Sequence, residues 1–255
     1  MRLVAWNCAM ALHRKFEALQ ALKPDVAVIA ECAEPARLAE RLDLSGLSSS
    51  PVWVGENPNK GLAVFGFNGH RIALAPIHRP RLRFLAPVTV EGAASFNLLA
   101  VWAQNFSGGI RRKRQHGPLR LGLLRYREFL ASAPCVIAGD FNNNTIWDRP
   151  DWRMNHGHAV ARLAAGGLVS AYHELRGEAP GAELDPTHYW RDRRKDGPTY
   201  HIDYVFLPRL WLAGLKEVEI GSFEAWCGNG LSDHVPVVVE VDVRAGPKTP
   251  SAVAT

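Results

Sequence analysis

Short apolar runs recur along the whole chain and alternate with polar or glycine-containing segments. Most of these runs are rich in Val, Ile or aromatic residues and end at Gly, Pro, Asn or Asp, a pattern typical of β-strands. The runs are Leu3–Trp6, Val26–Ala30, Leu62–Phe67, Phe96–Trp102, Cys135–Ala138, Ile202–Leu207 and Val235–Val243. We therefore predict a strand over each of them.

Three of the intervening segments carry apolar residues at helical spacing. They are His13–Leu22, Leu119–Leu130 and His158–Ala165. Pro24 follows the first segment and Gly166-Gly167 follows the third, and both residue types commonly end helices. The pattern predicts a helix over each segment.

The connections between some neighbouring strands are too short to contain a crossover helix. The link between Leu62–Phe67 and a further apolar segment, Arg71–Leu74, is an example. Short links favour antiparallel pairing, so we expect a layered α/β domain and not a doubly wound parallel sheet. No repeat or linker divides residues 1–244, which we assign to one domain. Residues 245–255 lose apolar periodicity and are predicted to form a flexible tail.

Composition narrows the class of protein. With 255 residues, 47% hydrophobic and 22% charged, the chain is predicted to be globular, which excludes disordered and collagen-like proteins. The 30 Lys and Arg exceed the 25 Asp and Glu by five, and this excess favours a polyanionic partner. The four cysteines lie far apart, and no apolar run approaches the roughly 20 residues that span a bilayer. We expect a cytoplasmic monomer without a membrane partner.

Polar residues occur at the ends of the predicted strands. A single carboxylate at a strand end is most often a turn or cap residue, but here five polar motifs follow one another along the chain. They are Trp6-Asn7, Glu31, Gly139-Asp140-Phe141-Asn142, His201-Ile202-Asp203-Tyr204 and Ser232-Asp233-His234. The repeated placement indicates a common cleft.

In their order, these motifs resemble the endonuclease/exonuclease/phosphatase superfamily. Its DNase I-like fold is shared by exonuclease-III-like repair enzymes, DNase I, sphingomyelinases and inositol polyphosphate phosphatases. The resemblance also includes Pro24-Asp25 before Glu31, and it extends from residue 6 to residue 234. It implies a four-layer sandwich, in which two mainly antiparallel sheets pack face to face between outer helices, with the site at one end of the sheets.

The resemblance implies a site for Mg²⁺ or Mn²⁺. Hydrolysis of a phosphate ester needs neutralisation of the phosphate charge and a water nucleophile. Glu31 is the predicted ligand, because hard cations prefer carboxylate oxygens, and Asn7 would add its neutral amide oxygen. Asp233 is expected close by or bound through water.

A second group of residues is predicted to manage protons. His234 is the leading acid/base residue, with Asp203 as the carboxylate that orients its ring. Asp140 would accept a proton from the attacking water or position it, and Asn142 would donate to the phosphate. Either Asp140 or His234 could be the base.

One family feature is missing. The central strand of many family phosphatases and DNase I-type enzymes ends in a Thr-His pair, whose histidine contacts the phosphate. The corresponding stretch, Leu98–Asn105, has no histidine, although Asn105 could serve. The pattern is therefore closest to exonuclease-III-like enzymes, with some residues of that branch also absent.

Two basic segments are candidates for substrate binding. Arg111–Arg114 follows a glycine pair, and Arg191–Lys195 follows Trp190. A charge run is often only a solvated surface, and a tryptophan is often buried, yet beside a phosphoesterase cleft Arg111 and Arg112 could contact phosphates. Trp190 could stack on a base.

We therefore predict a divalent-metal phosphodiesterase that acts on nucleic acid as an endonuclease or exonuclease. A phosphatase or phosphodiesterase of a small or lipid phosphate is the alternative. A third hypothesis is a binding module that has lost activity. The complete set of polar motifs argues against it.

Overall fold

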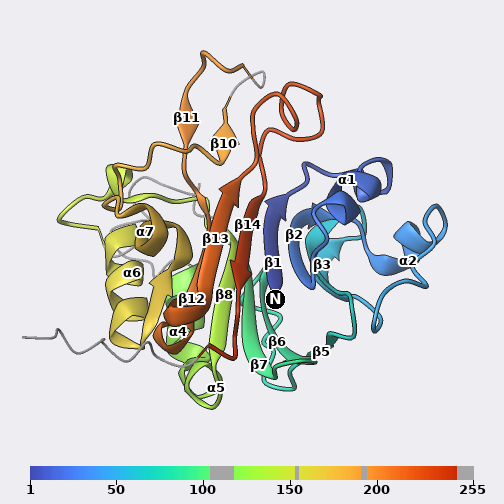
Figure 1. Cartoon of the computed structure of the whole chain (residues 1–255), viewed down its shortest axis with the longest axis horizontal. Helices are drawn as coiled ribbons and strands as arrows, with labels where there is room; N and C mark the ends of the chain where they lie inside the picture. Colours follow the sequence, from blue (N-terminus) through green and yellow to red (C-terminus); the bar gives the residue numbers. More distant parts are fainter. Residues whose placement is uncertain (104–117, 153–154, 191–193, 246–255) are drawn as a thin grey trace, which may run out of the picture.

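The structure, a computed structural model, describes residues 1–103, 118–152, 155–190 and 194–245. Most strands belong to two six-stranded sheets (Figure 1). The first sheet has the order β13 (Leu215–Ile220), β14 (Val237–Val241), β1 (Arg2–Asn7), β2 (Val26–Cys32), β4 (Lys60–Gly66), β3 (Val52–Asn57). The second has the order β5 (Arg71–Leu74), β6 (Leu85–Glu91), β7 (Phe96–Trp102), β8 (Cys135–Asp140), β12 (Asp203–Pro208), β9 (Leu168–Ser170). Each sheet contains one parallel pair, β1–β2 and β7–β8, among antiparallel neighbours.

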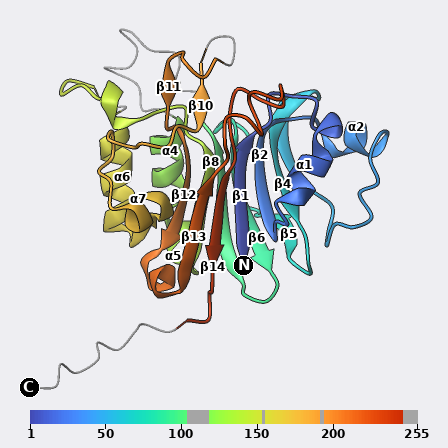
Figure 2. The ribbon, with the colours of Figure 1, turned by 45° about the horizontal axis from the view of Figure 1, so that its top comes forward.

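Helices cover the outer faces of the two sheets (Figures 1 and 2). The helices beside the first sheet are α1 (Phe16–Ala21) and α2 (Pro35–Ala39). Those outside the second sheet are α4 (Pro118–Arg125), α5 (Arg127–Ala131) and α6 (His156–Ala165), and α7 (Ala171–Arg176) packs where β12 and β13 approach each other. The short ribbon of β10 (His188–Tyr189) and β11 (Thr199–Tyr200) projects from one end of the sandwich (Figure 2). The predicted α/β four-layer sandwich is confirmed.

Side-chain alternation explains how the layers pack. On β1, Leu3 and Ala5 join the core between the two sheets, whereas Val4 and Trp6 face the helical layer that contains Phe16. The second sheet is likewise apolar on both faces, with a separate core beneath its helices. Burial on both faces explains why the strands read as nearly continuous apolar runs.

The predicted strands are confirmed, although β4 and β12 are offset by one or two residues and β14 is two residues shorter at each end. Strands β3, β6, β9 and β13 were not predicted from the sequence. Strand β14 begins at Val237 and not at Val235, because Val235 donates its amide to the carbonyl of Thr187 outside the sheet and Pro236 has no amide to donate.

The predicted helices need three corrections. The segment Leu119–Leu130 forms two helices, since Tyr126 leaves the helical conformation (φ −99°, ψ 11°). Helix α6 begins at His156, two residues early, because the Asp148 carboxylate accepts the amides of His156 and Gly157. A 3-10 turn, Leu12–Arg14, opens the segment before α1.

Two expectations about the organisation of the chain stay predictions. The predicted tail, 245–255, lies outside the described residues except for Ala245. The assignment of residues 1–244 to one domain stays a prediction. Among the described residues, no helix combines the length and the apolarity needed to cross a membrane.

Candidate active site

The predicted site residues from the two sheets meet in the gap between them. Asn7 ends β1 on the same face as Leu3 and Ala5, and Asp140 ends β8 on the same face as Ala138. Nδ2 of Asn7 donates to Oδ2 of Asp140 at 3.0 Å, and both side chains are buried. Alternation along two strands of different sheets thus brings an amide and a carboxylate together.

Asp140 has a second acidic neighbour within its own sheet. Asp203, the first residue of β12, lies directly opposite it in the antiparallel register. Oδ2 of Asp203 is 2.8 Å from Nδ1 of His234, and both residues are buried. One ligand atom from each of Asp140, Asp203 and His234 lies within 4.8 Å of the others. The structure therefore forms the predicted His234–Asp203 pair and places Asp140 beside it.

The segment that carries His234 is fixed to β1 by two hydrogen bonds and is braced by one within itself. The hydroxyl of Ser232 donates to the carbonyl of Asn7 (2.6 Å) and accepts from the amide of His234 (3.0 Å). The indole Nε1 of Trp6 donates to the carbonyl of His234 (3.1 Å). The Trp6-Asn7 and Ser232-Asp233-His234 motifs are therefore structural partners as well as carriers of site residues.

Glu31 occupies an irregular position on β2. Its φ of 58° lies in the left-handed region, and the β2–β4 register shifts between Ala30 and Cys32. Strained backbone of this kind is concentrated at functional sites. Oε1 of Glu31 is 3.4 Å from Nδ2 of Asn7. The bulge thus turns the carboxylate towards the cleft.

The Asn7 amide links the two carboxylates. Its Nδ2 faces Glu31 and Asp140, while its Oδ1 accepts a hydrogen bond from the amide of Ala9 (3.0 Å). The predicted metal contact through the amide oxygen stays a prediction.

Asn142 holds Asp140 in place. Its backbone amide donates to Oδ1 of Asp140 (2.8 Å), and its side-chain Nδ2 donates to Oδ2 (2.9 Å). Asn142 has a positive φ of 46°, which folds the chain back over the carboxylate. Its predicted contact with the phosphate stays a prediction.

Burial and neighbouring charges set the protonation of this cluster. Burial alone would lower the pKa of His234, but the charges of Asp203, Asp140 and Asp233 and the Asp203 hydrogen bond raise it to about 10. Burial, and then the charge of Asp203, raise the pKa of Asp140 well above that of an ordinary carboxyl. His234 is therefore an imidazolium at neutral pH, whereas Asp140 is the group that can exchange a proton.

His188 belongs to the site although the sequence analysis did not select it. Its ring centroid is 4.4 Å from that of His234, and its Nε2 is 3.8 Å from Oδ2 of Asp233. Burial opposes ionisation of Asp233, but the neighbouring imidazole of His188 and the charge of His234 hold its pKa below the usual range. His188 follows Thr187, so the sequence does contain a Thr-His pair, on a different strand from the one searched.

Lys60 is the second residue that the sequence analysis missed. Its Nζ lies 3.0 Å from Oε2 of Glu31 and 5.4 Å from the ring centroid of the buried Trp102. Lys60 starts β4, which pairs with β2 so that Gly61 lies opposite Cys32. Without this register, nothing in the sequence links Lys60 to Glu31.

The predicted substrate-binding residues have different outcomes. Asn105, Arg111 and Arg112 lie outside the described residues. Trp190 is 44% exposed and lines a cleft that begins at Asn142 and His188. Within the basic segment that follows it, Arg194 pairs with Asp196 and Lys195 pairs with Glu224. These two cations are therefore partly neutralised.

Comparisons with known proteins identify the fold. No protein-family model matches the sequence, and no curated protein does. Three similar solved structures each match with probability 1.00. The 3′ phosphatase NExo from Neisseria, bound to product DNA hairpin, has a TM-score of 0.68 at 19% identity over 95% of this chain and 99% of its own. An AP endonuclease from Archaeoglobus fulgidus has a TM-score of 0.68 at 15% identity over 95% and 100%. An endonuclease/exonuclease/phosphatase from Beutenbergia cavernae has a TM-score of 0.64 at 19% identity over 94% and 71%. The chain therefore has the DNase I-like fold of the endonuclease/exonuclease/phosphatase superfamily.

Proposed function

We propose that this protein is a divalent-metal-dependent phosphodiesterase that hydrolyses ester bonds in nucleic acid. The observation that carries the proposal is the buried cluster of Asp140, Asp203 and His234 beside Glu31. Burying several ionisable groups together is costly, and such clusters are concentrated at functional sites. The similar structures named for a 3′ phosphatase with a DNA hairpin and for an AP endonuclease support nucleic acid as the substrate.

The residues present fit a hard divalent cation. Oε1 of Glu31 faces the Asn7 amide, and its Oε2 pairs with the Lys60 ammonium, so a metal ion on this carboxylate would compete with that lysine. Glu31, with Asn7 and Asp233, would hold Mg²⁺ or Mn²⁺. Such an ion supplies neutralisation of the phosphate charge and a lowered pKa of bound water.

Asp140 and His234 have different roles in this mechanism. The water oxygen attacks phosphorus while Asp140 accepts the water proton, because its raised pKa makes it a base near neutral pH. His234 is already protonated, so it donates to the phosphate and then to the departing oxygen as the ester bond breaks. Asp203 orients the His234 ring and stabilises its charge.

His188 takes the place of the histidine that is absent from Leu98–Asn105. Its ring lies against His234 on the open side of the cluster, where it can donate to a phosphate oxygen. Asn142 lines the same side.

The test is hydrolysis of DNA and RNA by the purified protein in Mg²⁺ or Mn²⁺. Asp140→Asn and His234→Gln should each lower the rate by about 10²–10⁴-fold. Leu210→Ala, which changes an exposed residue away from the cleft, should retain the parent rate. Equal rates for the Asp140 variant and the parent would place the chemistry elsewhere.

Salt dependence separates the nucleic-acid substrate from a small phosphate ester. Binding of a polyanion releases counterions and weakens steeply as salt is added, whereas turnover of a small ester changes little. We further propose a cytoplasmic location, because all four cysteines are free and buried.

A further inference from the structure

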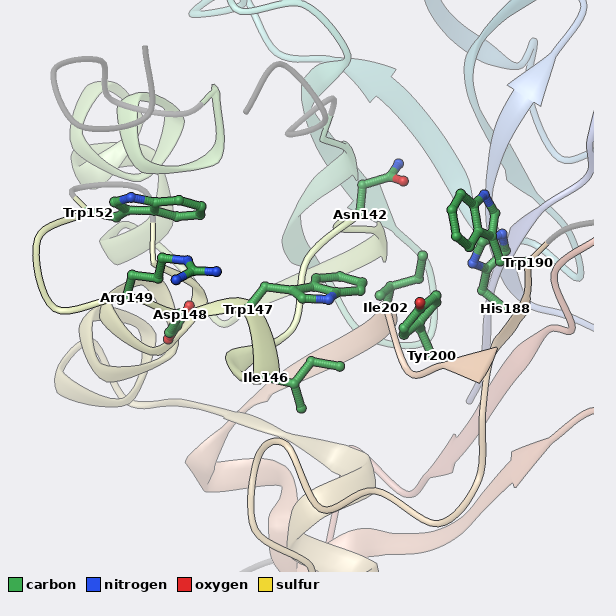
Figure 3. Close-up of a pocket in the computed structure, with 10 residues that line it drawn as sticks. All are labelled: Asn142, Ile146, Trp147, Asp148, Arg149, Trp152, His188, Trp190, Tyr200 and Ile202. Carbon is green, nitrogen blue, oxygen red and sulfur yellow. The ribbon is translucent and has the colours of Figure 1, made fainter. Parts of the chain in front are cut away.

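An open cleft with a volume of about 630 Å³ adjoins the catalytic cluster. Asn142 and His188 form the side nearest the cluster, and most of the remaining lining is aromatic, with Trp190 and Tyr200 beside His188 (Figure 3). The aromatic residues are Trp147, Trp152, Trp190 and Tyr200. No step of the proposed hydrolysis uses these four side chains.

The segment that carries Trp147 is firmly anchored. Trp147 ends the 3-10 turn Thr145–Trp147, where Oδ1 of Asn144 accepts the amide of Ile146 (3.0 Å). Nδ2 of the buried Asn144 donates to the carbonyl of His201 (2.8 Å). On the other side of Trp147, the Asp148 carboxylate caps α6. The indole is thus presented on a structured turn.

The lining suits flat aromatic ligands. The rings of Trp147 and Tyr200 are in contact, with centroids 4.8 Å apart, and the guanidinium of Arg149 lies 5.3 Å from the ring centroid of Trp152. Aromatic rings and guanidinium planes are the groups on which proteins stack nucleobases. A sugar phosphate without a base has no flat face to offer them.

A row of rings joins this cleft to the catalytic histidine. Tyr200 lies nearly parallel to His188, with an interplanar angle of 25° and centroids 6.2 Å apart, and His188 lies against His234. A ligand held at Tyr200 is therefore next to a phosphate held at His234.

From this arrangement we infer that the cleft binds an unstacked nucleobase beside the phosphate that is hydrolysed. The inference rests on the proposed nucleic-acid phosphodiesterase. Within a duplex, both faces of a base are covered by its neighbours, and flipping the base out costs free energy, so a base enters the cleft most readily from a single strand or a frayed end. Single-stranded nucleic acid is thus the preferred substrate.

The experiment combines a variant of the protein with a variant of the substrate. Single-stranded oligonucleotides carry one tetrahydrofuran in place of a nucleotide, and its position is moved along the strand. In the parent protein, removing the base beside the cleaved bond should lower kcat/KM by about ten- to a hundred-fold. Trp147→Ala should cause a loss of the same size on the intact strand and little further loss on the tetrahydrofuran strand. Leu210→Ala is the matched control and should follow the parent.

The outcomes separate this inference from the proposed function. If the parent cleaves the strands at rates that do not depend on the tetrahydrofuran position, or cuts paired duplex as fast as single strands, the cleft does not select a base. An equal loss for Trp147→Ala on both substrates would show a general structural effect and would also overturn the inference. If the parent cleaves no nucleic acid but hydrolyses a small or lipid phosphate, the proposed function itself fails.

A binding arm tests the cleft without hydrolysis. The Asp140→Asn protein is titrated with a single strand that contains fluorescent 2-aminopurine. The fluorescence of the 2-aminopurine should change on binding. This change should disappear in a protein that carries both Asp140→Asn and Trp147→Ala. If the proteins with and without Trp147→Ala give the same fluorescence change, or if neither gives one, the inference is contradicted.

Discussion

Lys60 forms an ion pair with Glu31, the carboxylate proposed to bind the metal, with Nζ 3.0 Å from Oε2. The lysine also lies over the indole of Trp102, which limits its freedom to move away. A fixed positive charge at this position opposes a second cation on the same carboxylate.

Replacing Lys60 should therefore strengthen metal binding. We expect Lys60→Met to lower the Kd for Mn²⁺ by about tenfold, because the repulsion between the ammonium and the ion is removed. Lys60→Arg keeps the charge and should leave the Kd close to that of the parent. Calorimetric titration of the metal measures both. Weaker binding by Lys60→Met would show instead that Lys60 positions Glu31.

The Asp203–His234 pair makes a prediction about protonation. Asp203→Asn removes the largest favourable charge acting on His234, so the pKa of the imidazole should fall, and hydrolysis should slow by about 10²–10⁴-fold. NMR titration of His234 reports the pKa separately from activity. Asp196→Asn, at an exposed ion pair, should change neither quantity. If the pKa of His234 is unchanged in Asp203→Asn, Asp203 does not act on His234 as proposed.

Replacing His188 should change both the rate of hydrolysis and the pKa of the neighbouring Asp233. We expect His188→Ala to slow hydrolysis by about ten- to a hundred-fold and to raise the pKa of Asp233, whose neighbouring imidazole is lost. His158→Ala, on the exposed face of α6, is the control. If His188→Ala hydrolyses the substrate at the parent rate, His188 does not take the place of the histidine that is missing from Leu98–Asn105.

His156 should make the fold sensitive to mild acid. Burial lowers the pKa of His156 to about 4, while the unfolded residue has a pKa of about 6.5. Between these values the unfolded chain binds a proton that the folded chain does not, so stability falls as pH decreases. The loss should approach about 3 kcal/mol near pH 4.

Urea unfolding at several pH values measures this effect. His156→Phe should unfold with a shallower pH dependence than the parent below pH 6.5, since the titrating group is gone. The exposed His158→Phe should keep the parent slope. Identical slopes for the parent and His156→Phe would assign the acid sensitivity to other buried groups, such as His201, whose pKa burial also lowers.

The sequence predicts those parts of the fold and site that depend on local pattern. Alternation along a strand fixes that Asn7 shares a face with Ala5, and that Asp140 shares one with Ala138. The order of the motifs then identifies the fold that brings these faces together. The central strands, which carry most of the candidate site residues, follow from these two signals, whereas β3, β6, β9 and β13 were not predicted.

The residues that were missed depend on relationships between distant segments. Lys60 reaches Glu31 only through the β2–β4 register, and His188 reaches His234 only through an isolated bridge between β10 and the segment before β14. Trp147 reaches the cleft through a turn held by Asn144. Neither spacing nor composition encodes such contacts, because each is set by tertiary packing.

The position of β1 has a consequence for shortened forms of the chain. β1 lies between β2 and β14, and its Val4 pairs with Val238, so β14 covers one edge of β1. The segment just before β14 carries His234 and is anchored to Trp6 and Asn7. A chain cut before residue 231 therefore loses His234 and also exposes an edge of β1, so removal of this segment would disrupt the first sheet and the candidate site together.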